Sequence, residues 1–286
     1  MHHHTLVTAE TLLQHLHQPD WVIFDARFSL ADAEAGAKAY RLGHLPNARY
    51  IHLNNDLSSP VRSYTGRHPL PNFSQLSVKL GAWGVNPRSQ VVVYDDASGA
   101  FAGRMWWLLR CMGHERVAVL DGGLKQWQRL DLPMTTHLPR STTQPFRCYL
   151  DESQWLSATE IENGLAKGSL KLIDARTMER FQGLQEPIDP IAGHVPKALN
   201  HPFQKNLDAK GLFLPASELK KQFQALLGNN ISSEKVVHMC GSGVTACHNL
   251  LAMEVAGLKG SKLYAGSWSE WITNPNRPVR SNATDN

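Results

Sequence analysis

The chain has 286 residues, of which 42% are hydrophobic and 19% are charged, with a formal net charge of +4. This length suits one large domain or two of ordinary size, and so small and dispersed a charge does not favour a nucleic-acid partner. No apolar run approaches the roughly 18 residues of a membrane span, and the N-terminus lacks the build of a signal peptide. We therefore expect neither a nucleic-acid nor a membrane partner, whereas a small anionic substrate fits the mild basicity.

Short apolar runs alternate with helical patterns along the chain. In the first half we predict buried strands at 91–94 and 117–120, with a helix at 101–112 between them. In the second half we predict three strands, at 172–174, 236–239 and 262–264. Strands that alternate with helices favour an α/β fold, in which helices cover both faces of a parallel sheet.

Four segments of the first half return in the second half in the same order. Residues 22–27 match 171–176, 43–48 match 193–198, 91–95 match 236–240, and 121–127 match 265–271. The offsets all lie between 144 and 150 residues. We therefore predict two homologous domains, at 5–130 and 152–280, joined by a linker at 131–151 that contains prolines and a Ser-Thr-Thr run.

The most informative local pattern is the loop Cys240-Gly241-Ser242-Gly243, which follows the strand predicted at 236–239 and precedes a helical pattern. Backbone N–H groups of the loop and the helix N-terminus would surround the sulfur and favour its thiolate form. A buried structural cysteine is the alternative, because unreactive cysteines are commonly buried. The glycines on both sides of Ser242 favour catalysis, since a loop that wraps a sulfur needs them and a packing cysteine does not.

The other cysteines and the histidines give no further site. The four cysteines, Cys111, Cys148, Cys240 and Cys247, form no C-x-x-C pair, so we predict reduced thiols in a cytoplasmic protein. Cys247 lies on an apolar stripe and is expected in the core. The histidines lack ligand spacing, so no metal site is expected. Residues 2–4 are all histidine and are either a tag remnant or native sequence, so they are left out of the candidate site.

Taken together, these features resemble the two-domain sulfurtransferases of the rhodanese family over nearly the whole chain. The resemblance rests on the Asp-Ala-Arg and Gly-His-x-Pro motifs of both halves, on the Cys240 loop and on a Gly-Ser pair before a tryptophan, at 25–27, 43–46, 174–176, 193–196, 240–245 and 266–271. It implies two tandem rhodanese-like domains, each with a parallel sheet flanked by helices. It also implies that the N-terminal domain is inactive, because Asp95 stands where the second half has Cys240.

The resemblance implies a transferase that needs no metal and no organic cofactor. Cys240 would accept sulfur as a persulfide and pass it to cyanide, a small thiol or a protein thiol such as thioredoxin. The loop resembles that of family members that use 3-mercaptopyruvate. Thiosulfate is the alternative donor, but members that prefer it carry Arg-Lys where this chain has Gly241-Ser242.

The sequence leaves two other classes of protein as alternatives. A non-catalytic or sulfur-carrier binding module is one alternative, but the intact Cys240 and its glycines argue against a loss of activity. A phosphatase of the same fold is the other, and it needs an arginine at the sixth position after the cysteine. This chain has Ala246 there, which argues against phosphate chemistry.

The resemblance also implies a set of site residues around Cys240. Ser242 is expected to be catalytic, and its hydroxyl, like that of Thr245, can donate to the persulfide; both residue types are also common helix caps. The residues Gly241, Gly243, Val244 and Thr245 are expected to bind the substrate. Arg180 is expected to bind the donor carboxylate with two hydrogen bonds, and a surface ion pair is its alternative role.

Roles are also expected for Arg176, Arg67, His44 and Asp32. Arg176 is expected to be structural. Mercaptopyruvate enzymes often carry a second arginine shortly after Glu-Pro, where this chain has Ile188, so Arg67 is a candidate substitute or else a solvated loop charge. His44 is expected to act as an acid–base group with Asp32 as its nearest candidate partner. Because Gly-His-x-Pro occurs in both halves, a structural role for His44 is the alternative.

Overall fold

The computed structural model describes residues 2–228 and 231–281. The chain divides into two compact units, each of which is described by itself. The first unit contains residues 1–59, 70–151 and 209–213, and the second contains residues 60–69, 152–208 and 214–286. Residues 60–69 thus belong to the second unit although they come from the N-terminal half of the sequence.

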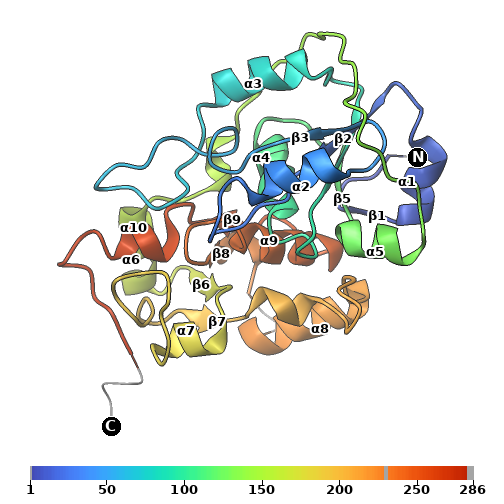
Figure 1. Cartoon of the computed structure of the whole chain (residues 1–286). Coiled ribbons are helices and arrows are strands. Elements are labelled where there is room, and N and C mark those ends of the chain that lie inside the picture. The colour runs from blue at the N-terminus through green and yellow to red at the C-terminus, as the bar shows by residue number, and fades with distance from the viewer. Residues whose placement is uncertain (1, 229–230, 282–286) are drawn as a thin grey trace. The chain divides into compact units, whose positions relative to one another are not determined.

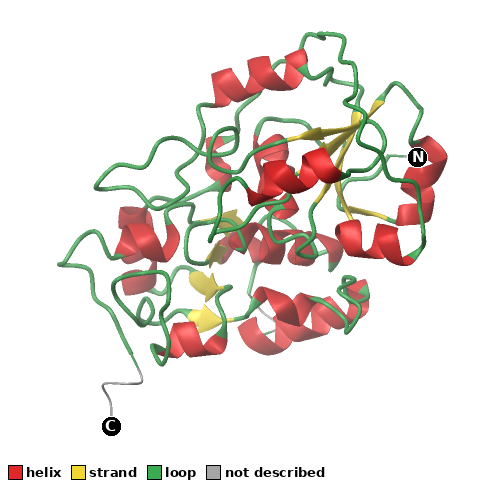
Figure 2. Ribbon diagram, in the orientation of Figure 1, coloured by secondary structure: helices red, strands yellow, loops and turns green. Residues whose placement is uncertain are grey.

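The first unit is built on a five-stranded parallel sheet with the order β1-β5-β4-β2-β3 (Figures 1 and 2). Its strands are β1 (Leu6–Val7), β2 (Trp21–Asp25), β3 (Ala48–Tyr50), β4 (Gln90–Tyr94) and β5 (Val117–Leu120). Its helices are α1 (Ala9–His15), α2 (Ala35–Leu42), α3 (Phe73–Ala82), α4 (Ala102–Cys111) and α5 (Gly123–Arg129). Every residue of β2 and β4 is buried, as expected for strands covered on both faces.

The second unit is built on a four-stranded parallel sheet with the order β7-β6-β8-β9. Its strands are β6 (Lys171–Asp174), β7 (Leu199–Asn200), β8 (Val236–Met239) and β9 (Lys262–Leu263). Its helices are α6 (Ala158–Lys167), α7 (Met178–Gln182), α8 (Ala216–Leu227), α9 (Ala246–Val255) and α10 (Ser267–Trp271), with 3₁₀ turns at Glu152–Gln154, Phe203–Asn206 and Ser233–Lys235. The predicted α/β class with a parallel sheet in each half is therefore confirmed.

The segment predicted as a linker groups with the first unit rather than standing apart. Backbone hydrogen bonds attach it along its length: Thr135 pairs with His44, Gln144 N donates to Gly81 O at 2.9 Å, and Tyr149 N donates to Met112 O at 3.0 Å. These bonds satisfy backbone groups that a solvated linker would leave to water.

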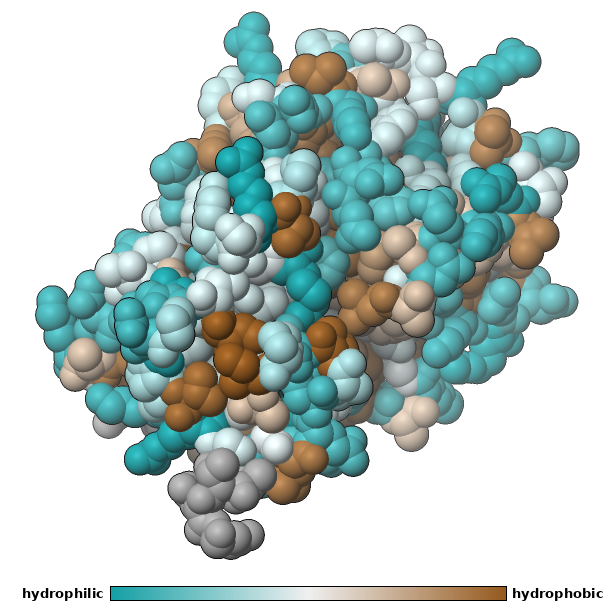
Figure 3. Space-filling view, turned by 60° about the vertical axis from the view of Figure 1, so that its left-hand side comes forward, coloured by the Kyte–Doolittle hydropathy of each residue, from teal (hydrophilic) through white to brown (hydrophobic). Residues whose placement is uncertain are grey.

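No helix in the described ranges is long and apolar enough to span a bilayer. On the face drawn in Figure 3, hydrophobic residues lie singly or in small groups among hydrophilic ones. Exposed apolar residues such as Leu42 and Val78 are ordinary on a folded protein and define no site by themselves.

The loop after β4 holds the carboxylate of Asp95 in a cradle of backbone donors. Asp95 is completely buried. One carboxylate oxygen accepts from the N–H groups of Ala97 and Gly99 at 2.9 and 2.8 Å, and the other accepts from Phe101 and Ala102, both at 2.8 Å. Burial nevertheless raises the pKa of Asp95. The loop therefore binds an anion, and that anion is the carboxylate of Asp95.

We predict that Asp95→Ala destabilises the first unit by about 2–5 kcal/mol, because it leaves four backbone donors without their acceptor. Asp95→Asn, which keeps one acceptor oxygen, should fall between this variant and the wild type. Urea unfolding measures the effect. The neighbouring Asp96 is exposed, and Asp96→Ala should stay within about 0.5 kcal/mol of the wild type. Equal stability of the two alanine variants would contradict the prediction.

Candidate active site

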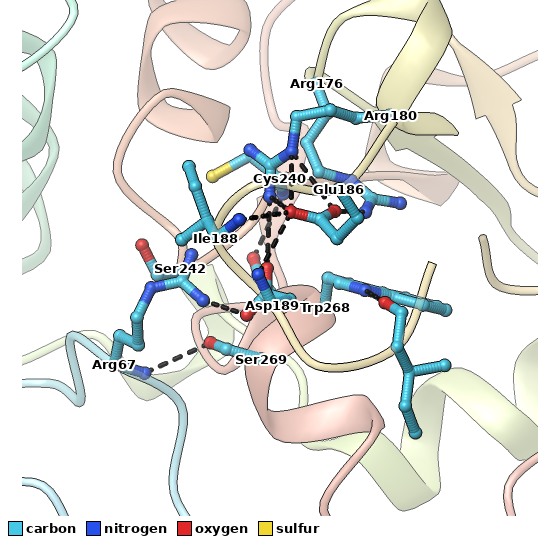
Figure 4. Close-up of polar contacts among 12 residues, drawn as sticks. Arg67, Arg176, Arg180, Glu186, Ile188, Asp189, Cys240, Ser242, Trp268 and Ser269 are labelled. Carbon is cyan, nitrogen blue, oxygen red and sulfur yellow. Dashed lines mark hydrogen bonds and ion pairs between the residues drawn. The ribbon is translucent and has the colours of Figure 1, made fainter. Parts of the chain in front are cut away.

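The thiol of Cys240 lies at the carboxyl end of β8, directly before the loop that leads into α9 (Figure 4). The side chain is 2% exposed. Gly243 N donates to Cys240 Sγ at 3.1 Å, and the Cys240 backbone N–H donates to Ser267 Oγ at 3.1 Å. The backbone thus fixes the cysteine and places one N–H donor against its sulfur.

The rest of the loop is constrained by its backbone. Gly243 has a φ of +75°, and a Cβ atom there would lie 2.2 Å from Ala265 O, so only glycine fits. Val244 is buried. Thr245 is the N-cap residue of α9, yet its side chain makes no capping hydrogen bond. Its hydroxyl is therefore not committed to capping.

Ser242 pairs with a histidine that the sequence did not reveal. Ser242 Oγ lies 2.7 Å from His68 Nδ1, and both side chains are buried. The backbone around His68 is attached to the second unit, because Arg67 N donates to Ser269 Oγ at 3.1 Å. A Cβ atom on Gly66 would lie 2.4 Å from Gly266 O, so this segment approaches α10 closely. The Cys240 loop thus carries a hydroxyl in hydrogen-bonding contact with an imidazole.

The structure gives His44 a packing role instead of the expected catalytic one. Its ring is fully buried and stacks on Tyr40 at 3.9 Å between centroids. Its Nδ1 lies 2.8 Å from Tyr40 O and its Nε2 lies 3.2 Å from His137 O. Both nitrogens therefore face backbone carbonyls, which leaves none for a substrate.

The matching histidine of the second unit packs in the same way. His194 Nδ1 lies 2.7 Å from Phe181 O, and its ring stacks on Phe181. The histidine of Gly-His-x-Pro is thus a repeated structural element. Asp32, the partner expected for His44, pairs instead with Lys38 at 3.0 Å on the surface.

Arg176 is held on every side by protein groups. Its Nη2 lies 2.7 Å from Asp174 Oδ2 and donates to Gly193 O at 2.7 Å. Its Nη1 lies 3.3 Å from Glu186 Oε2, and its guanidinium lies 4.7 Å from the ring centroid of Trp268. These contacts occupy the guanidinium within the fold, so it is not open to a substrate.

Arg180 and Arg67 share one carboxylate near the thiol (Figure 4). Arg180 Nη2 donates to Glu186 Oε1 at 2.7 Å and to Asp189 Oδ2 at 3.0 Å. Arg67 Nη1 donates to the other oxygen of Asp189. Burial raises the pKa of Asp189 although Arg67 and Arg180 flank it. For Glu186, burial acts to raise the pKa, but the hydrogen bonds from Arg180 and from backbone N–H groups outweigh it and lower the pKa.

Both arginines lie beside Gly241. A Cβ atom on Gly241 would lie 2.8 Å from Arg67 Nη2 and 3.5 Å from Arg180 Nη2. Ile188 contributes no charge; its backbone N–H donates to Glu186 Oε1 at 3.1 Å. Two cations therefore border the position directly after Cys240. Within the described ranges, no group of three or more His, Cys, Asp or Glu residues is arranged to hold a metal ion.

Both halves of the chain match the model of the rhodanese-like domain, over residues 8–130 and 157–274. The chain therefore belongs to the rhodanese-like family, as a tandem pair of such domains. A Pseudomonas aeruginosa protein named "Probable 3-mercaptopyruvate sulfurtransferase" is 47% identical over 276 residues, covering 96% of this chain and 97% of that protein.

One further relative carries thiosulfate in its name, and two solved structures carry 3-mercaptopyruvate. A Mycobacterium tuberculosis protein whose name gives thiosulfate sulfurtransferase is 36% identical and is covered over 96% of each chain. The solved structure of a 3-mercaptopyruvate enzyme from Escherichia coli has a TM-score of 0.79 and 31% identity, covering 94% of this chain and 100% of that one. The 3-mercaptopyruvate sulfurtransferase from Leishmania major has a TM-score of 0.81 and 28% identity, covering 96% and 75%.

We predict that Arg176→Ala destabilises the second unit by about 3–5 kcal/mol, because it leaves the buried Asp174 carboxylate without its cation. Arg176→Lys should recover part of this loss, since lysine keeps the charge and loses the paired hydrogen bonds. Urea unfolding is the measurement, with the exposed Arg280→Ala as control. Arg176→Ala and Arg280→Ala unfolding at the same urea concentration would contradict the prediction.

Proposed function

We propose that the protein takes sulfur from 3-mercaptopyruvate onto Cys240 and passes it to a thiol or to cyanide. The chain is a sulfurtransferase of the rhodanese-like family, and the donor, the persulfide and the roles of the individual residues are the proposed part. The observation that carries the proposal is the Cys240 thiol, which accepts from Gly243 N–H at 3.1 Å in a loop bordered by Arg67 and Arg180.

The first half-reaction moves sulfur onto the enzyme. The Cys240 thiolate attacks the sulfur of the donor, an S–S bond forms and the C–S bond of the donor breaks. The electron pair of the C–S bond goes to carbon and gives the enolate of pyruvate. Ser242, hydrogen-bonded to His68, supplies the proton that turns the enolate into pyruvate. Arg180 binds the donor carboxylate.

The second half-reaction releases the sulfur. A thiolate or cyanide attacks the outer sulfur of the persulfide, and the S–S bond breaks to return its electron pair to Cys240. The product is an acceptor persulfide or thiocyanate. A small thiol, cyanide or a protein thiol such as thioredoxin are the proposed acceptors, and the cytoplasm is the proposed location.

The charge balance of the site supports 3-mercaptopyruvate over thiosulfate. Three arginines, Arg67, Arg176 and Arg180, are matched by three carboxylates, Asp174, Glu186 and Asp189. A formally neutral cluster suits a monocarboxylate better than a dianion, because no excess positive charge compensates the donor and the electrostatic cost rises with the charge that is added. Thiosulfate, with cyanide as acceptor, remains the second candidate because of the donor in the name of the M. tuberculosis relative.

We predict that Cys240→Ser lowers sulfur transfer at least about 1000-fold and leaves the fold intact, because the hydroxyl is a much weaker nucleophile than the thiolate. Intact-mass measurement after donor treatment should show roughly 32 Da added to the wild type and nothing added to the variant. Cys148→Ser is the matched control and should gain the same mass as the wild type. Sulfur added to the Cys240→Ser protein would place the nucleophile elsewhere.

We predict a higher kcat/KM for 3-mercaptopyruvate than for thiosulfate. Arg180→Ala should lower kcat/KM for 3-mercaptopyruvate by roughly 30- to 1000-fold, the effect of losing a charge-assisted contact of about 2–4 kcal/mol. Arg180→Lys should restore it only in part. Steady-state kinetics with both donors provides the test, and a higher kcat/KM for thiosulfate in the wild type would refute the choice of donor.

A further inference from the structure

The guanidinium of Arg67 is only partly used by the protein. Its Nη1 donates to Asp189, and its Nε is buried with no hydrogen-bond partner among the described residues. Its Nη2 also donates to no residue in the described part of the chain. A buried donor without an acceptor costs stability. The Nε and Nη2 edge of the guanidinium is therefore suited to a ligand that supplies acceptor atoms.

The partly used edges of Arg67 and Arg180 meet at Gly241. Besides Arg67 Nη2 at 2.8 Å, a Cβ atom there would lie 3.6 Å from Arg180 Nη1, which donates to no residue within the described ranges. Gly241 does not have a positive φ, so its backbone does not require glycine. The missing side chain instead lets the guanidinium of Arg67 approach the backbone closely, because a Cβ atom there would displace it, so two cations lie against the residue after Cys240.

Asp189 fixes the two guanidiniums beside each other. Its side chain is 2% exposed, and its two oxygens accept from different arginines, Arg67 and Arg180. One shared carboxylate offsets the repulsion between the two cations and leaves their remaining N–H groups available. Glu186, which is 4% exposed, holds Arg180 from its Nε and Nη2 side.

We propose that Arg67 is a second donor-binding residue, which binds the carboxylate of the sulfur donor together with Arg180 beside Gly241. This rests on the proposed function in one respect, namely that an anionic donor reacts at Cys240. A planar carboxylate can accept from both guanidiniums, one oxygen for each, so the pair favours α-keto carboxylate donors. The residue comes from the N-terminal half of the sequence, whose own loop has no cysteine.

A purely structural role for Arg67 predicts different behaviour. In that role its ion pair with Asp189 would only attach residues 60–69 to the second unit. Arg67→Lys separates the two roles, because a lysine can keep one ion pair with Asp189 but cannot offer the Nε and Nη2 donors as well. Arg62 lies in the same segment and is exposed, and its guanidinium donates to Tyr64 Oη, so Arg62→Lys is a matched control.

The experiment measures KM, kcat and the urea midpoint for the wild type, Arg67→Lys, Arg67→Gln and Arg62→Lys. We expect both Arg67 variants to raise KM for 3-mercaptopyruvate about 10- to 100-fold, while kcat changes less than about 3-fold. Arg67→Lys should unfold at the wild-type urea concentration. At saturating donor it should form the Cys240 persulfide to the wild-type extent, and Arg62→Lys should match the wild type throughout.

A wild-type KM in Arg67→Lys would overturn the proposal, and so would a parallel loss of kcat and stability in that variant. A failure of the proposed donor is distinguishable from a failure of Arg67. If the wild type turns over thiosulfate only, the donor assignment fails. The same variants are then judged by the KM for thiosulfate, and an unchanged value overturns the role of Arg67.

Discussion

The second unit depends on one buried ion pair, that between Asp174 and Arg176. Arg176 extends from the end of β6 to Gly193 O, Glu186 and the ring of Trp268, and so attaches the segment after α7 to the sheet and to α10. Glu186 in turn holds Arg180. Arg180, one of the two cations beside Gly241, is therefore held through Glu186 by a buried charge pair. Such a pair is maintained because separating it would leave an uncompensated charge in a low dielectric.

The same pair exists in the first unit. Arg27 binds Asp25 at 2.6 Å and donates to Gly43 O at 2.7 Å, as Arg176 does with Asp174 and Gly193. The two units thus share the framework and differ at the loop after the central strand. Asp95 fills that loop in one unit and Cys240 occupies the start of it in the other, so the repeat preserves the support of the loop and changes only what the loop holds.

Much of the framework was predictable from the sequence, because it depends on local pattern. Apolar runs placed the strands at 91–94 and 236–239, and the glycines around Ser242 placed a tight loop after Cys240. His68 was missed because its contact with Ser242 spans 174 residues, and no local pattern encodes such a contact.

The error at His44 has a related origin. A histidine in a repeated motif stood out in the sequence, but repetition reflects the shared framework, where its ring stacks on Tyr40. Arg67 lies next to His68, so both polar groups of that segment reach the thiol loop together. A local signal was present in Gly66-Arg67-His68, because binding and catalytic residues are disproportionately carried on loops.

The loop around Asp95 binds a carboxylate that belongs to the chain itself and cannot dissociate, which distinguishes it from the Cys240 loop. A carboxylate attached to the chain has an effective concentration that no dissolved anion can match, so the first unit keeps its donors saturated throughout the life of the protein. Under the proposed function, the loop around Cys240 holds two occupants in turn, a thiolate and a longer persulfide. The repeated framework therefore carries one loop that its own side chain fills and, on the proposed function, one loop whose occupant changes during turnover.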